Sequence, residues 1–256
     1  MTPYKTLIKS WKLVEEKQIN HTYIAEIDVA IFDSYEKLYA DTNGEKGIRF
    51  SVPPQPFWGN IINPSVIVLF NNPNIIEVDD EYQKGLLDNI QGKERFDFLE
   101  MRNQQYRWEN GDAKYWQKRF KDIRDAVNAS CNGPQNYNDY IGEFEFHGYN
   151  TKTFSGFSKK HFPKGYIPTQ NVLFEYIQFL IKEVKPIIII ARGKTHWLNA
   201  LHLSEDDDNL IIVNNPQSAY LSKKLEGRGN IQADDFARII HRIVKDIKKT
   251  SKDSLV

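Results

Sequence analysis

Two short apolar runs, each leading into an Asn-Pro turn, constrain the fold of this chain more than any other feature. Residues 66–70 precede Asn72-Pro73, and residues 210–213 precede Asn215-Pro216. Runs this short are typical of buried parallel strands rather than of helices. In an open parallel sheet the ligand crevice lies at the carboxyl ends of the strands. We therefore expect the two Asn side chains to face one site, held by turns that proline stiffens.

Length and composition favour one compact domain over residues 1–256. The chain has 256 residues, 40% of them hydrophobic and 13% aromatic, which is enough to bury one sizeable core. The N-terminal residues lack a basic segment followed by a long apolar core, and the longest apolar run, 187–191, is too short to span a bilayer. We expect a soluble, cytoplasmic protein that has no membrane partner.

Cysteine content and charge limit the kinds of site. Cys131 is the only cysteine, which excludes an internal disulfide and any four-cysteine metal site within the chain. The net charge is zero, but residues 151–256 carry 17 Lys and Arg against 11 Asp and Glu, whereas residues 1–150 carry 17 against 23. Basic residues of the second half can either follow a phosphate backbone or remain solvated.

The remaining sequence alternates strand and helix patterns. Residues 52–60 are rich in proline and predict an extended lead-in, and residues 81–128 have the apolar spacing of helices. A strand is predicted at 143–147, a helix capped by Thr169, a strand at 187–191, a short helix at 193–201, a strand at 210–213 and a terminal helix at 234–248. This order predicts an α/β fold with right-handed crossovers.

At this point the motifs resemble those of the uracil-DNA glycosylase superfamily. The segment 53–74 is similar to its lead-in, first strand and water-activating loop, and Asn72-Pro73 falls on the Asn-Pro of the loop that the mismatch-specific and single-strand-selective branches write Gly-x-Asn-Pro-Gly. Asn215-Pro216-Gln217-Ser218 resembles the second motif. The resemblance covers residues 53–225 and leaves 1–52 as an N-terminal extension. It departs at Phe70 and Asn74, where the family has glycine.

The resemblance implies a three-layer α/β/α sandwich around a four-stranded, mainly parallel sheet. It also implies a monofunctional DNA glycosylase that acts on a flipped uracil-like, damaged or modified base, with DNA as partner, no obligate protein partner, no metal and no organic cofactor. Asn72 would position the water and Asn215 would stabilise the leaving base. The implied base contacts are Phe70, Asn71, Tyr149 and Asn150, and the implied DNA contacts are Lys152, Arg192, Lys194, Ser218, Tyr220, Leu221 and Lys223.

The chemistry of base excision fits two amides. Breaking an N-glycosidic bond needs a positioned water, a donor to the negative charge that develops on the base, and a pocket that excludes bulk water. Because duplex DNA hides this bond, the nucleotide must flip out, and a side chain must fill the gap. Tyr220 and Leu221, just past the second motif, are the candidates for that wedge.

Three alternatives stay open. Asn72 and Asn215 can equally stabilise turns, and Tyr149 can belong to the rim of the core. Glu143, Glu145 and His147 alternate along one strand and could bind a divalent metal, as in a metal-dependent nuclease, although cross-strand pairing explains the alternation as well. The third is a binding protein for nucleic acid or a small molecule that keeps the fold without the activity.

Overall fold

The computed structural model of the chain describes residues 2–13, 23–33, 48, 50, 54–71, 112–135, 137–151, 165–216, 220–223 and 230–253. The chain divides into two compact units. Unit 1 comprises Met1–Pro56, Asn71–Arg102 and Glu145–Phe179, and unit 2 comprises Phe57–Phe70, Asn103–Phe144 and Leu180–Val256. The expectation of a single domain over 1–256 stays a prediction.

A five-stranded sheet lies at the centre of the described fold, with strand order β1-β3-β2-β4-β5. The strands are β1 (Phe57–Gly59), β2 (Val66–Phe70), β3 (Ile141–Glu145), β4 (Ile187–Ile190) and β5 (Leu210–Ile212). β2 pairs in parallel with β4, and β4 pairs in parallel with β5. The prediction that the two apolar runs form parallel strands is confirmed, and the fold is α/β.

β2 and β3 also run in the same direction. The Ser65 N–H, just before β2, donates to the carbonyl of Tyr140, just before β3, over 2.8 Å. Beyond the other ends of these strands, the His147 N–H donates to the Asn71 carbonyl over 2.9 Å. The residues before the strands are thus paired with each other, as are the residues after them, which is the arrangement of parallel strands.

The prediction of four strands was wrong, because β1 forms a fifth strand that pairs antiparallel with β3. Residues 57–59 were expected only as part of an extended lead-in, since prolines surround them. Proline is tolerated beside an edge strand, however, and β1 lies at the edge of the sheet. The structure also places β3 two residues earlier than predicted, because Phe146 and His147 continue the alternation and the burial but not the strand.

Both faces of the central strands are buried. Val66, Ile67, Val68 and Leu69 are all 0% exposed, so neither face of β2 meets solvent. Strands covered on both sides are continuous apolar runs, which is why this part of the fold could be predicted from sequence.

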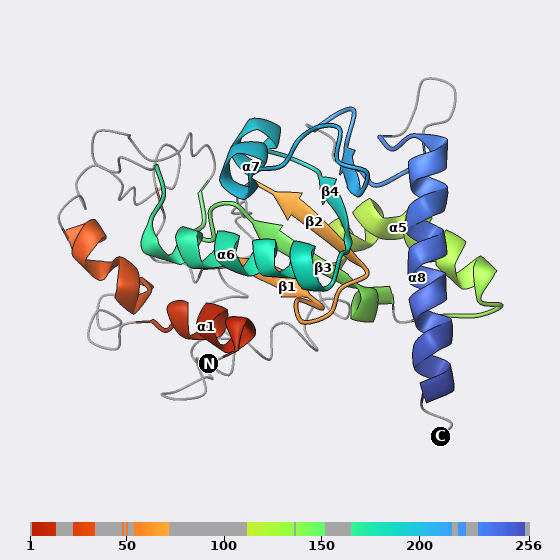
Figure 1. Ribbon diagram of the computed structural model, residues 1–256, viewed down its shortest axis with the longest axis horizontal. Helices are drawn as coiled ribbons and strands as arrows, with labels where there is room; N and C mark the ends of the chain where they lie inside the picture. Colours follow the sequence, from red (N-terminus) through yellow and green to blue (C-terminus); the bar gives the residue numbers. More distant parts are fainter. Residues whose placement is uncertain are drawn as a thin grey trace. The chain divides into compact units, whose positions relative to one another are not determined.

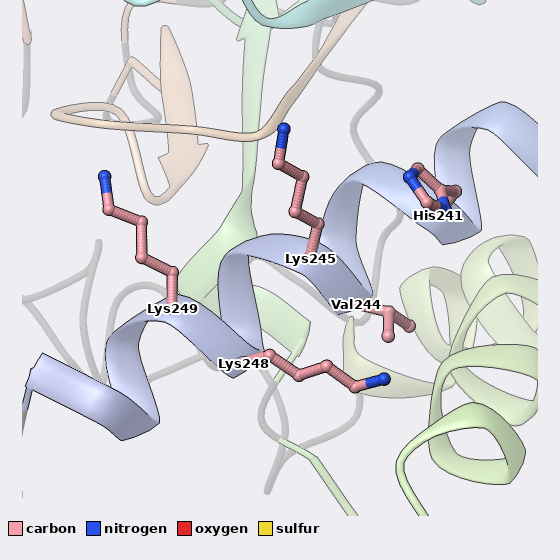
Figure 2. Close-up of a pocket in the computed structure, with 5 residues that line it drawn as sticks. All are labelled: His241, Val244, Lys245, Lys248 and Lys249. Carbon is pink, nitrogen blue, oxygen red and sulfur yellow. The ribbon is translucent and has the colours of Figure 1, made fainter.

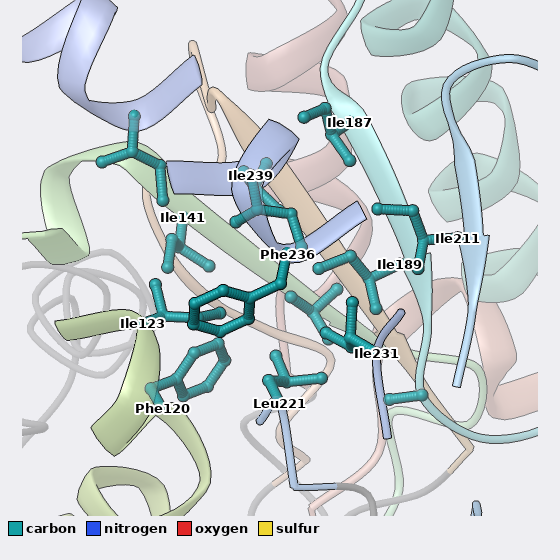
Figure 3. Close-up of a cluster of buried hydrophobic side chains, with 14 of the residues drawn as sticks. Phe120, Ile123, Ile141, Ile187, Ile189, Ile211, Leu221, Ile231, Phe236 and Ile239 are labelled. Atoms are coloured by element: carbon teal, nitrogen blue, oxygen red, sulfur yellow. The ribbon is translucent and has the colours of Figure 1, made fainter. Parts of the chain in front are cut away.

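Two helices cover one face of the sheet within unit 2. α5 (Asp112–Ser130) and α8 (Ala233–Asp253) contact each other, as Figure 1 shows. Alternate strand residues Val66, Val68 and Phe70 belong to the same cluster of buried side chains as residues of both helices. Figure 3 shows Phe120 of α5 beside Phe236 of α8. This cluster is the core of unit 2.

Further helical elements are α1 (Pro3–Ser10), α6 (Pro168–Glu183), α7 (Lys194–Leu201) and the short 3₁₀ turns η2 (Glu26–Asp28) and η3 (Tyr137–Tyr140). α6 begins at Pro168, a position that proline favours because the first helical N–H needs no partner within the helix. Thr169 therefore lies inside the first turn and is not the cap that the sequence predicted. The part of the predicted helical segment 81–128 that precedes residue 112 lies outside the described residues.

Candidate functional site

The carboxyl ends of β2, β4 and β5 meet at one edge of the sheet in unit 2, because the three strands are parallel. Backbone hydrogen bonds continue past the strands: the Ala191 N–H donates to the Leu69 carbonyl over 2.9 Å, and the Val213 N–H donates to the Ile190 carbonyl over 3.2 Å. We call this the strand-end edge. It carries the segments 191–193 and 213–216, as well as Phe70.

A side chain ties the second Asn-Pro turn to the turn after β4. Nε of Arg192 donates to the carbonyl oxygen of Pro216 over 3.0 Å. On the other side of the turn, the Asn214 N–H donates to the Asn230 carbonyl over 3.0 Å. Asn215 lies between these two anchors and is exposed. The turn is thus held at the strand-end edge, with the Asn215 residue at the surface.

The carboxyl end of β2 is held by α7. The buried indole N–H of Trp197 donates to the Phe70 carbonyl over 2.8 Å. The Phe70 ring packs in the core of unit 2, with the Arg119 guanidinium carbon 5.5 Å from its centroid, close enough for a cation–π contact. Asn71 follows, half-buried. The proposed water-positioning residue Asn72 lies outside the described residues.

Buried charge accompanies this core. Arg119 of α5 is 4% exposed and Glu143 of β3 is 3% exposed. Ile141 belongs to the core of unit 2, and side chains alternate along a strand, so Glu143 shares the sheet face that α5 and α8 cover. A charged side chain buried without a partner is costly, so both groups are places where the core of unit 2 is sensitive to substitution.

His147, the third member of the possible metal set, has a different environment. Its Nδ1 lies 3.0 Å from Nε2 of Gln170, and the same amide donates to the Phe146 carbonyl over 2.7 Å. Because an amide nitrogen can only donate, Nδ1 must accept and the proton of the neutral ring lies on Nε2. Within the described residues, no three His, Cys, Asp or Glu side chains gather closely enough to hold a metal ion.

Tyr149, an expected base contact, lies in the core of unit 1. Its hydroxyl donates to Oδ2 of Asp28 over 2.8 Å and accepts from the Ala25 N–H over 3.0 Å. Its ring is 1% exposed and packs against the rings of Trp11 and Phe32, with centroids 5.4 and 5.3 Å away. Burial, followed by the Asp28 charge, raises the pKa of the Tyr149 hydroxyl well above its usual value. In this conformation Tyr149 joins parts of unit 1, and no face of its ring is open to a base.

Asp28 is the buried residue that sequence reasoning missed. Its carboxylate accepts from the Thr169 hydroxyl over 2.6 Å and from the Thr169 N–H over 3.1 Å, in addition to Tyr149. It thus caps the first turn of α6 from a distant part of the chain. Burial raises the pKa of the Asp28 carboxyl to about 6, and these hydrogen bonds partly oppose the shift. The signal that the sequence offers is that Asp28 directly precedes the apolar run 29–32.

The other expected site residues are dispersed. Asn150 is 1% exposed in unit 1. Lys194 forms an ion pair with Glu205, with 2.5 Å between Nζ and Oε2. Leu221 is fully buried in the core of unit 2, so of the two wedge candidates only the half-buried Tyr220 has accessible surface. Lys223 is exposed. Lys152 and Ser218 lie outside the described residues.

The strand-end edge therefore gathers Phe70, Arg192 and Asn215, and Lys194 follows it at the start of α7. In sequence, Asn71 and Asn72 come directly after Phe70. Among the described helices, none combines the length and the apolar character that crossing a bilayer requires. Comparison of the chain with protein-family models, with curated proteins and with solved structures finds no match.

Proposed function

We propose that this chain is a monofunctional DNA glycosylase with a uracil-DNA-glycosylase-like, three-layer α/β/α fold. The observation that supports the proposal best is the hydrogen bond from Arg192 to the Pro216 carbonyl, 3.0 Å long. It anchors the second Asn-Pro turn at the sheet edge where β2 ends and from which the chain enters Asn72. In α/β sheets this edge is the place where ligands bind.

The proposed reaction divides the work between two amides. Asn72 orients a water molecule through its side-chain carbonyl oxygen, and the water attacks C1′ of the sugar as the bond from C1′ to the base nitrogen breaks. The attacking water loses one proton to solvent, and the departed base takes one proton from solvent. The bonding electrons leave with the base, and Asn215 donates a hydrogen bond from its amide to the base carbonyl where negative charge develops. An amide is not a general base at neutral pH, so the rate should be lower than with a carboxylate.

The exposed position of Asn215 suits this role, because a base that has left the duplex must reach it from solvent. Arg192 lies on the turn after β4 and Lys194 is the first residue of α7, and both would contact the flanking phosphates. Lys223, Lys152 and Ser218 are the further DNA contacts that the resemblance implies. Tyr220 is the wedge candidate that we keep, because a wedge needs surface to enter the stack and Leu221 is fully buried.

An excision assay tests the proposal. Oligonucleotides that carry uracil, hypoxanthine, ethenocytosine or 5-hydroxymethylated bases are incubated with the protein, and abasic sites are detected by alkaline cleavage. We expect product with the wild type. Asn215→Ala and Asn72→Ala should each lower the single-turnover rate about 100-fold or more, as loss of one transition-state hydrogen bond does. Asn199→Ala, an exposed Asn on α7, is the matched control and should retain the rate.

Other outcomes would replace the proposal. No abasic product from any of these bases, together with tight and salt-dependent DNA binding, would identify a binding protein instead. Magnesium-dependent strand scission that is lost in Glu145→Ala would identify a nuclease.

A further inference from the structure

The exposed face of α8 carries a group of lysines that form no ion pair within the described residues. A shallow pocket with a volume of about 460 Å³ is lined by His241, Val244, Lys245, Lys248 and Lys249. Figure 2 shows Lys245 and Lys249 extending on one side of the helix, and Val244 and Lys248 on another. Positions four residues apart fall on one face of a helix, which explains both rows. We call these five residues the basic face.

No carboxylate in the described part of the chain forms an ion pair with Lys245, Lys248 or Lys249. Several other cations there are paired, among them Lys12 with Glu26 and Lys121 with Asp125. The acid nearest in sequence, Asp246, turns elsewhere: its Oδ2 accepts from Nε of Arg242 over 2.8 Å and from the Ser65 hydroxyl over 2.7 Å. Three like charges within five residues repel one another, so this surface favours an anionic partner.

The core of unit 2 already uses the apolar face of α8. Phe236, Ile239, Ile243 and Ile247 are at most 8% exposed, and all belong to that core. A helix that binds a membrane must insert its apolar face between lipids, and α8 has no such face to offer. The exposed face of α8 attracts anions through its lysine charges, and the lysine methylene groups and Val244 are its apolar part.

The basic face lies away from the strand-end edge. Arg242 donates to the Lys185 carbonyl just before β4, and Asp246 binds Ser65 just before β2. The second half of α8 is therefore near the amino ends of these strands. β2 has five residues, and a strand of this length spans about 17 Å. A partner on the basic face thus does not occupy the site proposed for base excision.

We propose that the basic face of α8 binds the phosphate backbone of DNA as a second contact, separate from the excision site. From His241 to Lys249 the helix rises about 12 Å, a length over which duplex DNA presents about seven phosphate charges. The three lysines can contact some of these phosphates, and such contacts do not depend on the base sequence. The choice of DNA as the partner rests on the proposed function, but binding can be measured whether or not a base is excised.

Fluorescence anisotropy with a labelled duplex measures this contact. The test variant is Lys245→Gln with Lys248→Gln and Lys249→Gln, and the control variant is Lys5→Gln with Lys9→Gln and Lys182→Gln, which removes equal charge from exposed positions on α1 and α6. Counterion release from three phosphate contacts is worth up to about 500-fold at 0.1 M salt. We expect the test variant to bind at least tenfold more weakly and the slope of log K against log salt to fall by two to three, whereas the control should change little.

Two results would overturn the proposal: equal affinity and salt slope in the test variant and the wild type, or an equal loss in the control variant, which would show an effect of net charge alone. Binding to phosphatidylserine vesicles that is lost in the test variant, with DNA binding intact, would assign the face to anionic membranes instead. If excision occurs, the single-turnover rate at saturating protein should be unchanged in the test variant, while Asn215→Ala should lose excision and retain DNA binding. Failure of the two proposals is thereby distinguishable.

Discussion

At the scale of single residues, Asp28 of unit 1 is a buried carboxylate held by three hydrogen bonds. It receives hydrogen bonds from the Tyr149 hydroxyl and from both the hydroxyl and the N–H of Thr169. Burial nevertheless raises the pKa of its carboxyl from 3.8 to about 6. Between these two values the folded chain holds a proton at Asp28 that the unfolded chain has released. Folding then takes up a proton, so this group favours the folded state at low pH and the contribution is lost as pH rises through about 6.

This linkage predicts how stability depends on pH. Between pH 4 and pH 7.5 the wild type should lose up to about 3 kcal/mol of unfolding free energy that Asp28→Asn does not lose, because Asn cannot titrate. Urea unfolding at several pH values gives this difference. Asp122→Asn, at an exposed carboxylate on α5, is the control and should follow the wild type. Parallel curves for the wild type and Asp28→Asn would show that Asp28 does not titrate in this range.

Tyr149 shows why the environment of a single side chain could not be predicted from the sequence. A tyrosine that follows a strand can face a ligand or a core, and only distant residues decide between them. Here the decision comes from Asp28 and Ala25, more than 120 positions earlier in the chain. Phe70 ends β2 as the sequence predicted, and Leu221 follows the second motif, but the burial of both side chains depends on α5 and α8. The position of Asn215 and Arg192 at the strand-end edge, in contrast, follows from the parallel direction of the strands.

A second residue-scale prediction concerns Trp197. Trp197→Phe removes the donor to the Phe70 carbonyl and leaves a buried acceptor unsatisfied, so it should cost about 1–3 kcal/mol of unfolding free energy. Chemical denaturation measures this loss, with Asn199→Ala on the solvent side of α7 as the control. A change below about 0.5 kcal/mol would contradict the importance of this hydrogen bond for the end of β2.

At the scale of elements, the edge pairing of β1 with β3 depends on a close backbone approach. Gly142 faces Gly59 across the pair, and a Cβ at Gly142 would lie 2.5 Å from the Asn60 carbonyl oxygen. A backbone oxygen cannot move aside as a flexible side chain can. The strand was missed from sequence for a related reason: three residues beside prolines give too short a pattern, and the pairing depends on glycines 83 residues apart.

Substitution at these glycines tests the contact. Gly142→Ala should destabilise the fold by about 1–3 kcal/mol, as overpacking does. Gly133→Ala is the matched control, because no atom lies within 4 Å of a Cβ placed there. Gly133→Ala should be neutral or should stabilise the fold by up to about 1 kcal/mol, because alanine lowers the conformational entropy of the unfolded chain. Thermal unfolding of both variants measures the contrast, and equal melting temperatures would refute the close approach.

At the scale of the whole molecule, the two units share continuous elements. β3 passes from unit 2 into unit 1 after Phe144, and α6 passes from unit 1 into unit 2 after Phe179. Each unit consists of three separate segments of the chain. Cleavage of one peptide bond therefore cannot separate the two units into two fragments. The sequence does not predict this division, because the pattern of apolar residues in a strand or helix is the same in either unit.

Shared elements predict cooperative unfolding. Melting followed by tryptophan fluorescence and by far-UV circular dichroism should give one coincident transition. Gly142→Ala in unit 2 should lower that midpoint by both probes equally, and so should Thr169→Val in unit 1, which removes a hydroxyl donor to Asp28. Two separate transitions, with each variant moving only one of them, would show that the units unfold independently.

The bond between Asp28 and α6 also bears on synthesis of the chain. Asp28 leaves the ribosome 141 residues before Thr169, the residue whose backbone N–H it binds. Until residue 169 has emerged, nothing of α6 exists for this carboxylate to cap, and the Asp28 carboxylate stays hydrated. The core around Tyr149 can therefore close only after residue 169 has been translated, and Asp28 stays without this partner while the 141 residues that follow it are made.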